Sequence, residues 1–344
     1  MEKESVKMAV VGAGAIGGVT AALLSRAGWD LELVCKHQEI VDRACSDGLH
    51  VFGVKGEHRI ALKAVKEIRE LSGPKDVVFL ATKANDCIEA ARDLRPFLHE
   101  NSAVVSLQNG ICEEALAEVL GADRVVGCVV AWGATMQGPG ELEITSGGEI
   151  VIGPIDHQPD ERLPLLKEML DAVAPTRISE NIMGELYSKL IINACINSLG
   201  VMAGVSLGGL LALKKARVIF IGLMREAMAV ADAMGIKVEP GGGGKLDYYR
   251  FLGHRSLVAD LRRHLFIRAI GFKYRRIKSS SLQSLERGRK TEIDYLNGYI
   301  CDRGREHGVP TPLNDAVVTM VKEIEDGKRK ITPENLNAPV YLDI

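Results

Sequence analysis

The stretch Val10–Gly17 reads VVGAGAIG and lies between an apolar run that begins at Met8 and an alanine-rich segment that continues to Leu24. The run Met8–Val11 predicts a buried strand, and Ala15–Leu24 predicts the helix that follows it. A glycine-rich turn in this context is typical of dinucleotide sites, because the free N–H groups at the helix N-terminus face a pyrophosphate. The turn residues predicted to bind the dinucleotide are Gly12, Ala13, Gly14, Ala15, Ile16 and Gly17.

The three glycines of this turn have different expected roles. Gly12 allows the tight turn, Gly14 lets the backbone approach the ligand, and Gly17 lets the helix pack closely on the strand. The alternative interpretation is a glycine-rich turn that holds no ligand. The strand before the turn and the helix after it favour the dinucleotide site.

Length, charge and cysteine content narrow the class of protein. The chain has 344 residues, of which 47% are hydrophobic, and a formal net charge of −2. This length suggests two domains, and the charge gives no reason to expect nucleic acid or an anionic membrane as the main partner. Met1–Lys7 leads into the first strand without a signal-peptide pattern, so we expect a cytoplasmic protein. The seven cysteines show no CxxC spacing, and we expect neither a disulfide nor a metal site.

Strands and helices alternate along the first half of the chain. This alternation predicts an α/β domain with a doubly wound, Rossmann-type parallel sheet covered on both faces. We expect Gly48–Val54 and Arg59–Leu62 to form a hairpin, and two short strands within Gly133–Gly153 to close the main sheet. The other predicted strands are Asp30–Cys35, Asp76–Ala81, Ala103–Leu107 and Val125–Ala131, and the other predicted helices are Asp86–Leu98 and Glu113–Leu120.

The second half of the chain has a helical pattern. From about Glu161 onward, apolar residues recur at helical spacing, which predicts an all-α domain. We place the boundary near Glu180, with the dinucleotide-binding domain over residues 1–180, a helical substrate domain over 181–330 and a tail over 331–344. The four main predicted helices are Ile182–Met202, Ala212–Met234, Ser281–His307 and Leu313–Gly327.

The end of the second strand indicates which dinucleotide binds. An NAD site commonly places Asp or Glu there for the ribose hydroxyls, whereas a 2′-phosphate needs a cation. Lys36 follows this strand, and Glu32 lies within the strand rather than at its tip. The sequence therefore favours NADPH over NADH. The alternative is that Lys36 is only a solvated lysine.

Two further polar segments follow predicted strands. Lys83 lies in the segment ATKA that begins at Ala81, and Asn109 lies in the segment LQNG that begins at Leu107. Open α/β sheets bind ligands at the carboxyl ends of their strands, so Lys83 and Asn109 are candidates to contact a cofactor ribose or a reacting carbonyl. Taken singly, an Asn-Gly pair is usually a turn and a lysine at a strand end is usually solvated.

The helix that starts near Glu185 carries polar residues along one side. Lys189, Asn193 and Asn197 recur every four residues and therefore form one row on an otherwise apolar helix. Because a buried amide without a partner is costly, we expect polar groups to face this row. The alternatives are hydrogen bonds between the domains or the solvent face of an amphipathic helix.

Two segments nearer the C-terminus add candidate residues. Ser280 and Gln283 fit a capping box at the start of a long predicted helix. Glu292 has the apolar neighbours Ile293 and Leu296, so it lies at the edge of the expected buried face of that helix. A carboxylate there needs a partner, and Lys189 would be a suitable one.

In combination, these motifs make the chain resemble the ketopantoate reductases, also called 2-dehydropantoate 2-reductases, from Met8 to about Lys328. The resemblance implies an N-terminal Rossmann domain, an α-helical C-terminal domain like that of 6-phosphogluconate dehydrogenase, and an active site in the cleft between them. The motifs that carry it are the glycine turn, Thr82-Lys83, Gln108-Asn109-Gly110, the row Lys189–Asn197, SSSLQ at Ser279–Gln283 and EIDYLNG at Glu292–Gly298.

The resemblance also implies roles for the matching residues. A hydride passes from NADPH to the C2 carbonyl of a 2-oxo acid, Lys189 donates the proton to the developing alkoxide, and Glu292 holds that lysine in place. Asn109 positions the nicotinamide or the substrate, and Lys83 lies against the cofactor. The residues implied to bind polar groups of the substrate are Asn193, Asn197 and Ser280.

The implied reaction is the reduction of 2-dehydropantoate to (R)-pantoate, on the route to pantothenate and coenzyme A. Two alternatives stay open, namely a reductase of another 2-oxo acid on the same fold and an NADP-binding redox sensor without turnover. The presence of Lys189 and Glu292 argues against the sensor, because a sensor needs no proton donor. Exposed apolar helix faces in the second domain are compatible with a homodimer.

The chain also departs from the pattern of the family it resembles. Leu207 and Ile277 stand where the best-known members have asparagines near the substrate. The stretch from the glycines Gly241–Gly244 to Lys278 is longer and more basic than the family pattern. We interpret this stretch as a solvated helix face, as a lid, or as extra cations for a larger or more acidic substrate.

Overall fold

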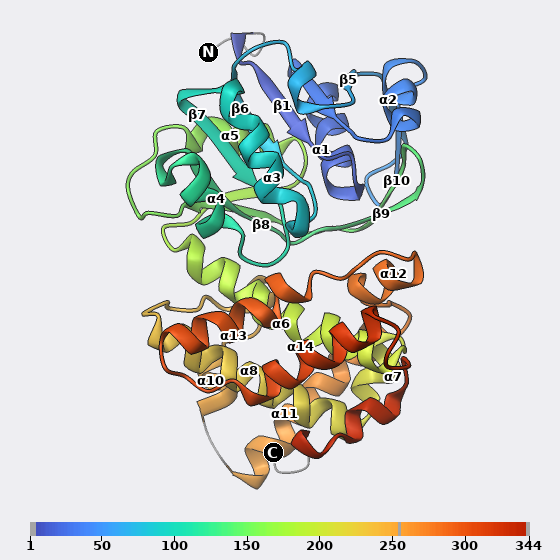
Figure 1. The fold of residues 1–344 in the computed structure, drawn as a ribbon, viewed down its shortest axis with the longest axis vertical. Helices are drawn as coiled ribbons and strands as arrows, with labels where there is room; N and C mark the ends of the chain where they lie inside the picture. The colour runs from blue at the N-terminus through green and yellow to red at the C-terminus, as the bar shows by residue number, and fades with distance from the viewer. Residues whose placement is uncertain (1–4, 254–255, 342–344) are drawn as a thin grey trace. The chain divides into compact units, whose positions relative to one another are not determined.

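The structure is a computed structural model that describes residues 5–253 and 256–341. Its contacts divide the chain into two compact units, which Figure 1 shows as ribbons. The first unit comprises the described residues up to Gln108 together with Cys112–Leu186, and the second comprises Asn109–Ile111 together with the described residues from Tyr187 onward. The division lies inside helix α6 (Ile182–Ala203), shortly after the boundary expected near Glu180.

An eight-stranded sheet organises the first unit, in the order β12-β11-β8-β7-β6-β1-β2-β5. Neighbouring strands are parallel except for β8 and β11. Every residue of β1 (Met8–Val11) and of β8 (Val125–Val130) is buried, as expected for strands covered on both faces. The remaining strands are β2 (Leu31–Val34), β5 (Lys63–Val65), β6 (Lys75–Leu80), β7 (Leu98–Ser106), β11 (Ile150–Pro154) and β12 (Thr176–Ile178).

Five α-helices belong to this sheet and confirm the predicted doubly wound α/β fold. Helix α1 contacts α5, and helix α3 contacts α4, so the helices pack as two groups. Helix α4 has the predicted bounds, Glu113–Leu120, and α1 covers Ala15–Arg26. The other helices are α2 (Gln38–Cys45), α3 (Ala84–Leu94) and α5 (Leu163–Asp171).

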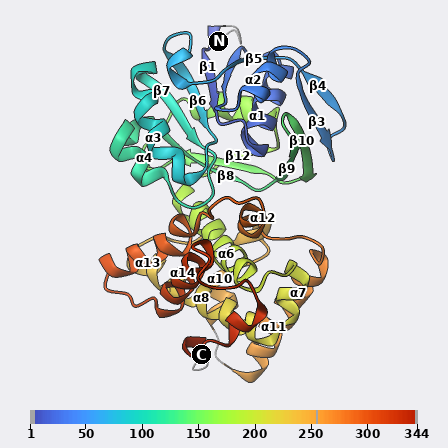
Figure 2. The same cartoon turned by 45° about the vertical axis from the view of Figure 1, so that its right-hand side comes forward.

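A second sheet of four strands in the same unit has the order β4-β3-β10-β9 (Figure 2). The predicted hairpin is confirmed as the antiparallel pair β3 (Leu49–Gly53) and β4 (His58–Ile60). The expectation that two strands within Gly133–Gly153 close the main sheet is wrong, because β9 (Gly133–Gly138) and β10 (Glu141–Ser146) pair in this second sheet. Burial alternates along β10, which is the pattern of a strand with one covered face.

Two further differences from the sequence prediction have local causes. The helix predicted for Asp86–Leu98 ends at Leu94, because Pro96 lies in a 3₁₀ turn at Arg95–Phe97 and β7 begins at Leu98. The pattern predicts only helices after about Glu161, but β12 adds a strand to the main sheet. A strand of three residues is too short to show a period of two in the sequence.

The second unit is helical, and its described residues form helices and turns with no strand, which confirms the predicted all-α architecture. Helix α6 has the length and composition of a membrane span, with a mean hydropathy of 1.3, but 78% of its apolar window is buried, as in a core helix. The other helices are α7 (Leu207–Ala212), α8 (Lys214–Ala233), α9 (Gly241–Gly244), α10 (Tyr248–Gly253), α11 (Leu257–Lys273), α12 (Ser280–Glu286), α13 (Asn297–Glu306) and α14 (Pro312–Glu325).

The long helix predicted for Ser281–His307 is wrong, because the chain forms α12, a 3₁₀ turn at Ile293–Tyr295 and then α13. Gly288 has a φ of +70° and follows the last turn of α12, where its N–H donates to the carbonyl of Leu285. A left-handed glycine at this position is a common helix terminator. The sequence signal for the break was therefore the glycine itself.

Candidate functional site

The glycine turn of the first unit has the geometry expected of a dinucleotide site. Gly12 has a φ of +108°, and a Cβ there would lie 2.7 Å from the carbonyl carbon and oxygen of Ala81. A Cβ on Gly17 would lie 1.9 Å from the carbonyl oxygen of Gly12, so only glycine fits this contact between helix and turn. A Cβ on Gly14 would meet nothing within 4 Å. The two crowded glycines shape the turn, and the third leaves open space at the start of α1.

The start of α1 also suits an anion. Gly14 is the N-cap residue, no side chain caps the helix, and its first turn has no acidic residue. The N–H groups at a helix N-terminus and the helix dipole both favour a negative charge. Among the other predicted turn residues, Ala13 is buried, and Ala15 and Ile16 are half-buried.

The two charged residues at strand β2 have different environments. Lys36 is exposed and lies 3.5 Å from the carboxylate of Asp86, in the first turn of α3. Glu32 is 9% exposed and accepts hydrogen bonds from the backbone N–H of Ser72 at 3.1 Å and its hydroxyl at 2.8 Å, as well as from the ammonium of Lys75. Burial alone would raise the pKa of Glu32, but these hydrogen bonds and the charge of Lys75 lower it below its usual value. The carboxylate of Glu32 therefore forms its hydrogen bonds inside the unit, and Lys36 is the exposed charged side chain at the end of the strand.

Strands β6 and β7 bring their following residues to the same edge of the sheet as the glycine turn. The sheet order places β6 between β1 and β7. The side-chain amide of Gln108 donates to the hydroxyl of Thr82 at 3.4 Å and accepts from the hydroxyl of Ser106 at 2.7 Å. Lys83 is half-buried and is the N-cap residue of α3. Gly12 packs against Ala81, and Lys83 follows Ala81 by two residues.

In the second unit, the polar row on α6 meets the first residue of α12. Lys189 and Asn193 are half-buried, and Asn197 is 5% exposed. The hydroxyl of Ser280 donates to the side-chain oxygen of Asn197 at 3.1 Å, across 83 residues of sequence. The structure therefore brings together two of the residues predicted to bind substrate.

The capping box predicted for Ser280 is wrong by one residue. Ser279 is the N-cap residue of α12, and its hydroxyl accepts a hydrogen bond from the N–H of Leu282 at 3.3 Å. Ser279 has the extended backbone that an N-cap residue adopts. Because Ser280 is the first residue of the helix and is exposed, its hydroxyl is left to contact Asn197.

Glu292 does not lie in a helix, in contrast to the prediction. It is half-buried and precedes the 3₁₀ turn at Ile293–Tyr295. Thr291 anchors this segment, because its N–H donates to the carboxylate of Glu325 at 2.7 Å and its hydroxyl accepts from the N–H of Ile293 at 3.2 Å. The pairing of Lys189 with Glu292 stays a prediction.

Asn109 belongs to the second unit, together with the two residues that follow it. Gly110 has a φ of +86°, and a Cβ there would lie 2.4 Å from the carbonyl oxygen of Tyr295. The loop that carries Asn109 therefore packs against the same 3₁₀ turn that Glu292 precedes. Asn109 itself is half-buried.

Two long-range contacts near these residues had no signal in the sequence. The hydroxyl of Tyr248, which is 1% exposed, donates to the carbonyl oxygen of Ser188 at 2.6 Å, one residue before Lys189. The N–H of Leu207 donates to the carbonyl of Ile277 at 2.7 Å, so the two apolar replacements noted in the sequence are neighbours. Both contacts join segments that are far apart in the chain, which periodicity and spacing do not reveal.

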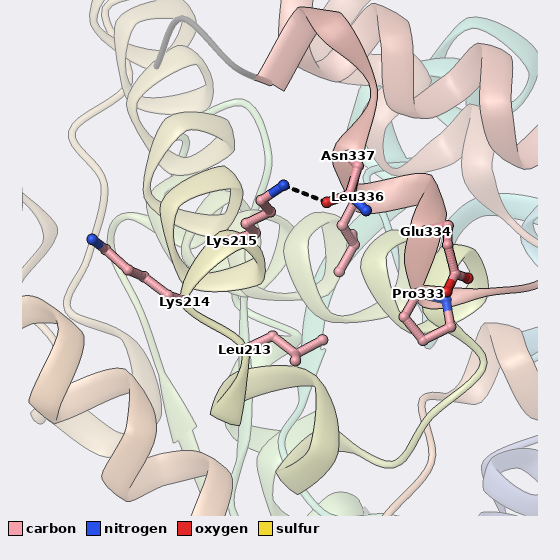
Figure 3. Close-up of a pocket in the computed structure, with 7 residues that line it drawn as sticks. All are labelled: Leu213, Lys214, Lys215, Pro333, Glu334, Leu336 and Asn337. Atoms are coloured by element: carbon pink, nitrogen blue, oxygen red, sulfur yellow. Dashed lines mark hydrogen bonds between the residues drawn. The ribbon is translucent and has the colours of Figure 1, made fainter.

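A surface hollow of about 260 Å³ in the second unit lies apart from all of these residues (Figure 3). None of the predicted site residues lines it. In Figure 3, Lys215 donates to the side-chain oxygen of Asn337, and Lys214 extends away from the other side chains. The hollow is lined by Leu213, Lys214, Lys215, Pro333, Glu334, Leu336 and Asn337. Among the residues that the structure describes, no group of three or more His, Cys, Asp or Glu side chains could hold a metal ion.

A doubly wound sheet with a glycine-rich dinucleotide turn, followed by an all-α unit with a partly buried polar row, defines a class of two-part nucleotide-dependent oxidoreductases. The family model described as "Ketopantoate reductase PanE/ApbA" matches residues 8–157, and the model described as "Ketopantoate reductase PanE/ApbA C terminal" matches residues 181–325. The chain therefore belongs to the ketopantoate reductase family.

Individual relatives agree with this assignment. A protein of Aquifex aeolicus (strain VF5) named 2-dehydropantoate 2-reductase is 28% identical over 324 residues, which cover 93% of this chain and 97% of the relative. The crystal structure of a PanE/ApbA family ketopantoate reductase from Ralstonia eutropha JMP134 has a TM-score of 0.79 at 29% identity, covering 94% of this chain and all of that one. A ternary structure of D-mandelate dehydrogenase with NADH and anilino(oxo)acetate shares the fold, with a TM-score of 0.78 at 23% identity and coverage of 96% and 100%.

Proposed function

We propose that this protein reduces 2-dehydropantoate to (R)-pantoate with NADPH, and that Lys189 donates the proton. The observation that carries the proposal is the polar row on α6, where Asn197 is buried and is in contact with Ser280. Burying such a row in an apolar helix is favourable only when polar groups face it. Two relatives that align with 93% of this chain are named 2-dehydropantoate 2-reductase, and these names support the choice of substrate.

The residues of the first unit fit a dinucleotide. A Cβ at Gly12 or Gly17 would collide with backbone atoms, whereas the space beside Gly14 is open for a ligand to approach the start of α1. Lys36 would hold the 2′-phosphate that distinguishes NADPH from NADH. Glu32 is bound to Ser72 and Lys75, so it is not available to accept hydrogen bonds from the ribose of NADH.

NADPH supplies the hydride when it is bound, and the protein has to provide the proton and the charge stabilisation. The ammonium of Lys189 would donate its proton to the oxygen at C2 as negative charge develops there. A cation beside that oxygen stabilises the transition state more than the ground state, where the carbonyl carries no full charge. Glu292 would orient Lys189, and Asn109 and Lys83 would position the cofactor and the substrate.

The amides and the hydroxyl of the polar row would select the substrate. The amides of Asn193 and Asn197 can donate hydrogen bonds to a carboxylate, and the hydroxyl of Ser280, whose hydrogen is donated to Asn197, can accept a hydrogen bond from a substrate hydroxyl. A site built to pair with a substrate hydroxyl discriminates strongly against an analogue that lacks it, because its own polar groups are then left unpaired.

A second candidate is the reduction of another 2-oxo acid by the same residues. The observation that favours it is the apolar pair Leu207 and Ile277, which are joined by a backbone hydrogen bond. Apolar side chains at these positions would suit a substrate with an apolar group. The third possibility, an NADP-binding redox sensor, leaves the proton donor Lys189 without a role.

The test is the steady-state oxidation of NADPH with a panel of 2-oxo acids that includes 2-dehydropantoate and analogues in which its hydroxyl is replaced by hydrogen or by an aryl group. The proposal predicts the highest kcat/KM for 2-dehydropantoate. A higher value for an analogue without the hydroxyl favours the second candidate. Binding of NADPH without turnover of any member of the panel favours the sensor.

A further inference from the structure

The carboxylate of Asp86 lies beside the cation that we assign to the 2′-phosphate. Its oxygen Oδ2 is 3.5 Å from the ammonium of Lys36. Asp86 is in the first turn of α3, and Lys36 follows the last residue of β2 by two positions. The dinucleotide site therefore contains a negative charge next to its positive one, which the position of Lys36 in the sequence does not reveal.

The ion pair reaches across the end of β1. The sheet order places β1 between β2 and β6, and both neighbours run parallel to it. The segments that carry Lys36 and Asp86 therefore leave the sheet at the same edge, on either side of the strand that leads into Gly12. The N–H of Gly12 donates to the carbonyl of Val34 at 2.9 Å, and a Cβ on Gly12 would meet the backbone of Ala81. A dinucleotide bound at the glycine turn thus lies close to both charges.

Both charged groups are open to solvent. The side chain of Lys36 is 75% exposed, and that of Asp86 is 54% exposed. An ion pair between exposed groups contributes little to stability, because water solvates each partner nearly as well. A ligand can therefore replace either partner of this pair at little cost.

The two charges act differently on the two nicotinamide coenzymes. The 2′-phosphate of NADPH carries between one and two negative charges, and a phosphate held by the ammonium of Lys36 is repelled by the carboxylate of Asp86 at the same ammonium. NADH has a ribose hydroxyl at this position, and NAD sites commonly use a carboxylate to accept its hydrogen bond. Glu32, the carboxylate within β2, already accepts three hydrogen bonds inside the unit.

We propose that Asp86 is a specificity-determining residue of the dinucleotide site, which lowers the affinity for NADPH and accepts a hydrogen bond from the ribose of NADH. The protein then binds both coenzymes, because Lys36 serves the phosphate and Asp86 serves the hydroxyl. This inference rests on the dinucleotide site of the proposed function, but it depends neither on the identity of the 2-oxo acid nor on the proton donor.

The alternative is that Asp86 serves only its helix. A carboxylate in the first turn interacts favourably with the helix dipole, and Lys83, the N-cap residue of α3, makes no side-chain cap. Removing a charge that acts only on the helix lowers Tm but leaves the relative affinity for the two coenzymes unchanged. The ratio of the two dissociation constants therefore separates the two roles.

The experiment is titration of the full-length protein with NADPH and with NADH, followed by the fluorescence of the nicotinamide. For Asp86→Asn we expect the Kd for NADPH to fall about fivefold, which is the effect of one unit charge about 4 Å from another in bulk water. The Kd for NADH rises about threefold, because an amide oxygen is a weaker acceptor than a carboxylate. The ratio of the Kd for NADH to the Kd for NADPH thus rises about 15-fold.

Asp93→Asn is the matched control, because Asp93 is an exposed aspartate on the same helix. It lies about 10 Å further along α3, at 1.5 Å per residue, which exceeds the Debye length of about 8 Å in physiological salt. Both dissociation constants of this variant should stay within about twofold of those of the unaltered protein.

Movement of both constants in the same direction in Asp86→Asn, or a ratio within about twofold of the original, overturns the proposal. An equal change of the ratio in Asp93→Asn also overturns it. Binding of neither coenzyme to the unaltered protein contradicts the dinucleotide site and the role of Asp86 together. The expected change of the ratio in a protein that turns over no 2-oxo acid supports the role of Asp86 and contradicts only the proposed reaction.

Discussion

Gly14 and Gly17 lie three residues apart in one turn, but the space beside Gly14 is open and the space beside Gly17 is filled. Replacing Gly14 with alanine therefore tests cofactor binding, and replacing Gly17 with alanine tests folding. A Cβ on Gly17 would lie 1.9 Å from the carbonyl oxygen of Gly12 and 2.7 Å from the Cβ of Ala81. Relief of this clash requires the helix to move away from the strand. Overpacking of this kind costs about 1–3 kcal/mol, against a gain of about 1 kcal/mol from the better helix propensity of alanine.

We therefore expect Gly17→Ala to lower the free energy of unfolding of the first unit by about 1 kcal/mol, which corresponds to a fall in Tm of roughly 2–4 °C. Gly14→Ala has open space around its Cβ and a φ of −68°, which any residue adopts. It should cost less than about 1 kcal/mol, as expected for an N-cap change. Its methyl group would instead occupy the approach to the N–H groups of α1, so the Kd for NADPH should rise at least about tenfold.

The assay combines thermal unfolding without ligand and titration of NADPH fluorescence for the same three proteins. A Gly17→Ala protein that melts at the wild-type temperature would contradict the clash between α1 and the glycine turn. A Gly14→Ala protein that binds NADPH as tightly as the wild type would show that the open space beside Gly14 has no connection with the cofactor.

Three other predictions follow from the site. Lys36→Glu should weaken NADPH binding far more than NADH binding, and equal effects in the two titrations would defeat the assignment of Lys36 to the 2′-phosphate. Because the pKa of Glu32 is lowered in the folded protein, its contribution to stability is present above the usual pKa of a glutamate and is lost as the pH falls through the lower pKa of the folded state. Acid unfolding should therefore be shallower in Glu32→Gln; an unchanged slope contradicts this. Ser279→Ala should lower the free energy of unfolding by about 1 kcal/mol, because the helix cap is lost. Ser280→Ala should leave Tm unchanged and raise the KM for the substrate. The reverse pattern would show that the cap is assigned to the wrong serine.

Local signals were sufficient for much of the first unit. The strand Met8–Val11, the glycine turn and the helix Glu113–Leu120 are read directly from apolar periodicity and from glycine placement, and each is present in the structure. The same reasoning predicted α6, since its apolar residues extend over many turns. Where an element is long and regular, burial of its apolar face decides the structure, and the pattern of that face is visible in the sequence.

The remaining features depend on contacts between distant segments. The contact between Ser280 and Asn197 joins positions 83 residues apart. The assignment of β9 and β10 to a second sheet depends on pairing with β3, about ninety residues earlier in the chain. A prediction from spacing has no information on such partners, and it therefore placed Glu292 in a helix that the left-handed Gly288 ends.

The turnover of Lys189→Met, measured together with its affinity for NADPH, shows whether Lys189 donates the proton. Methionine keeps an unbranched apolar stem on α6 but cannot donate a proton. General acid catalysis contributes about 10²–10⁴ to a rate, so we predict that kcat with 2-dehydropantoate falls at least about 100-fold while the Kd for NADPH changes by less than about twofold. Turnover near the wild-type value would contradict the assignment of Lys189 as the proton donor.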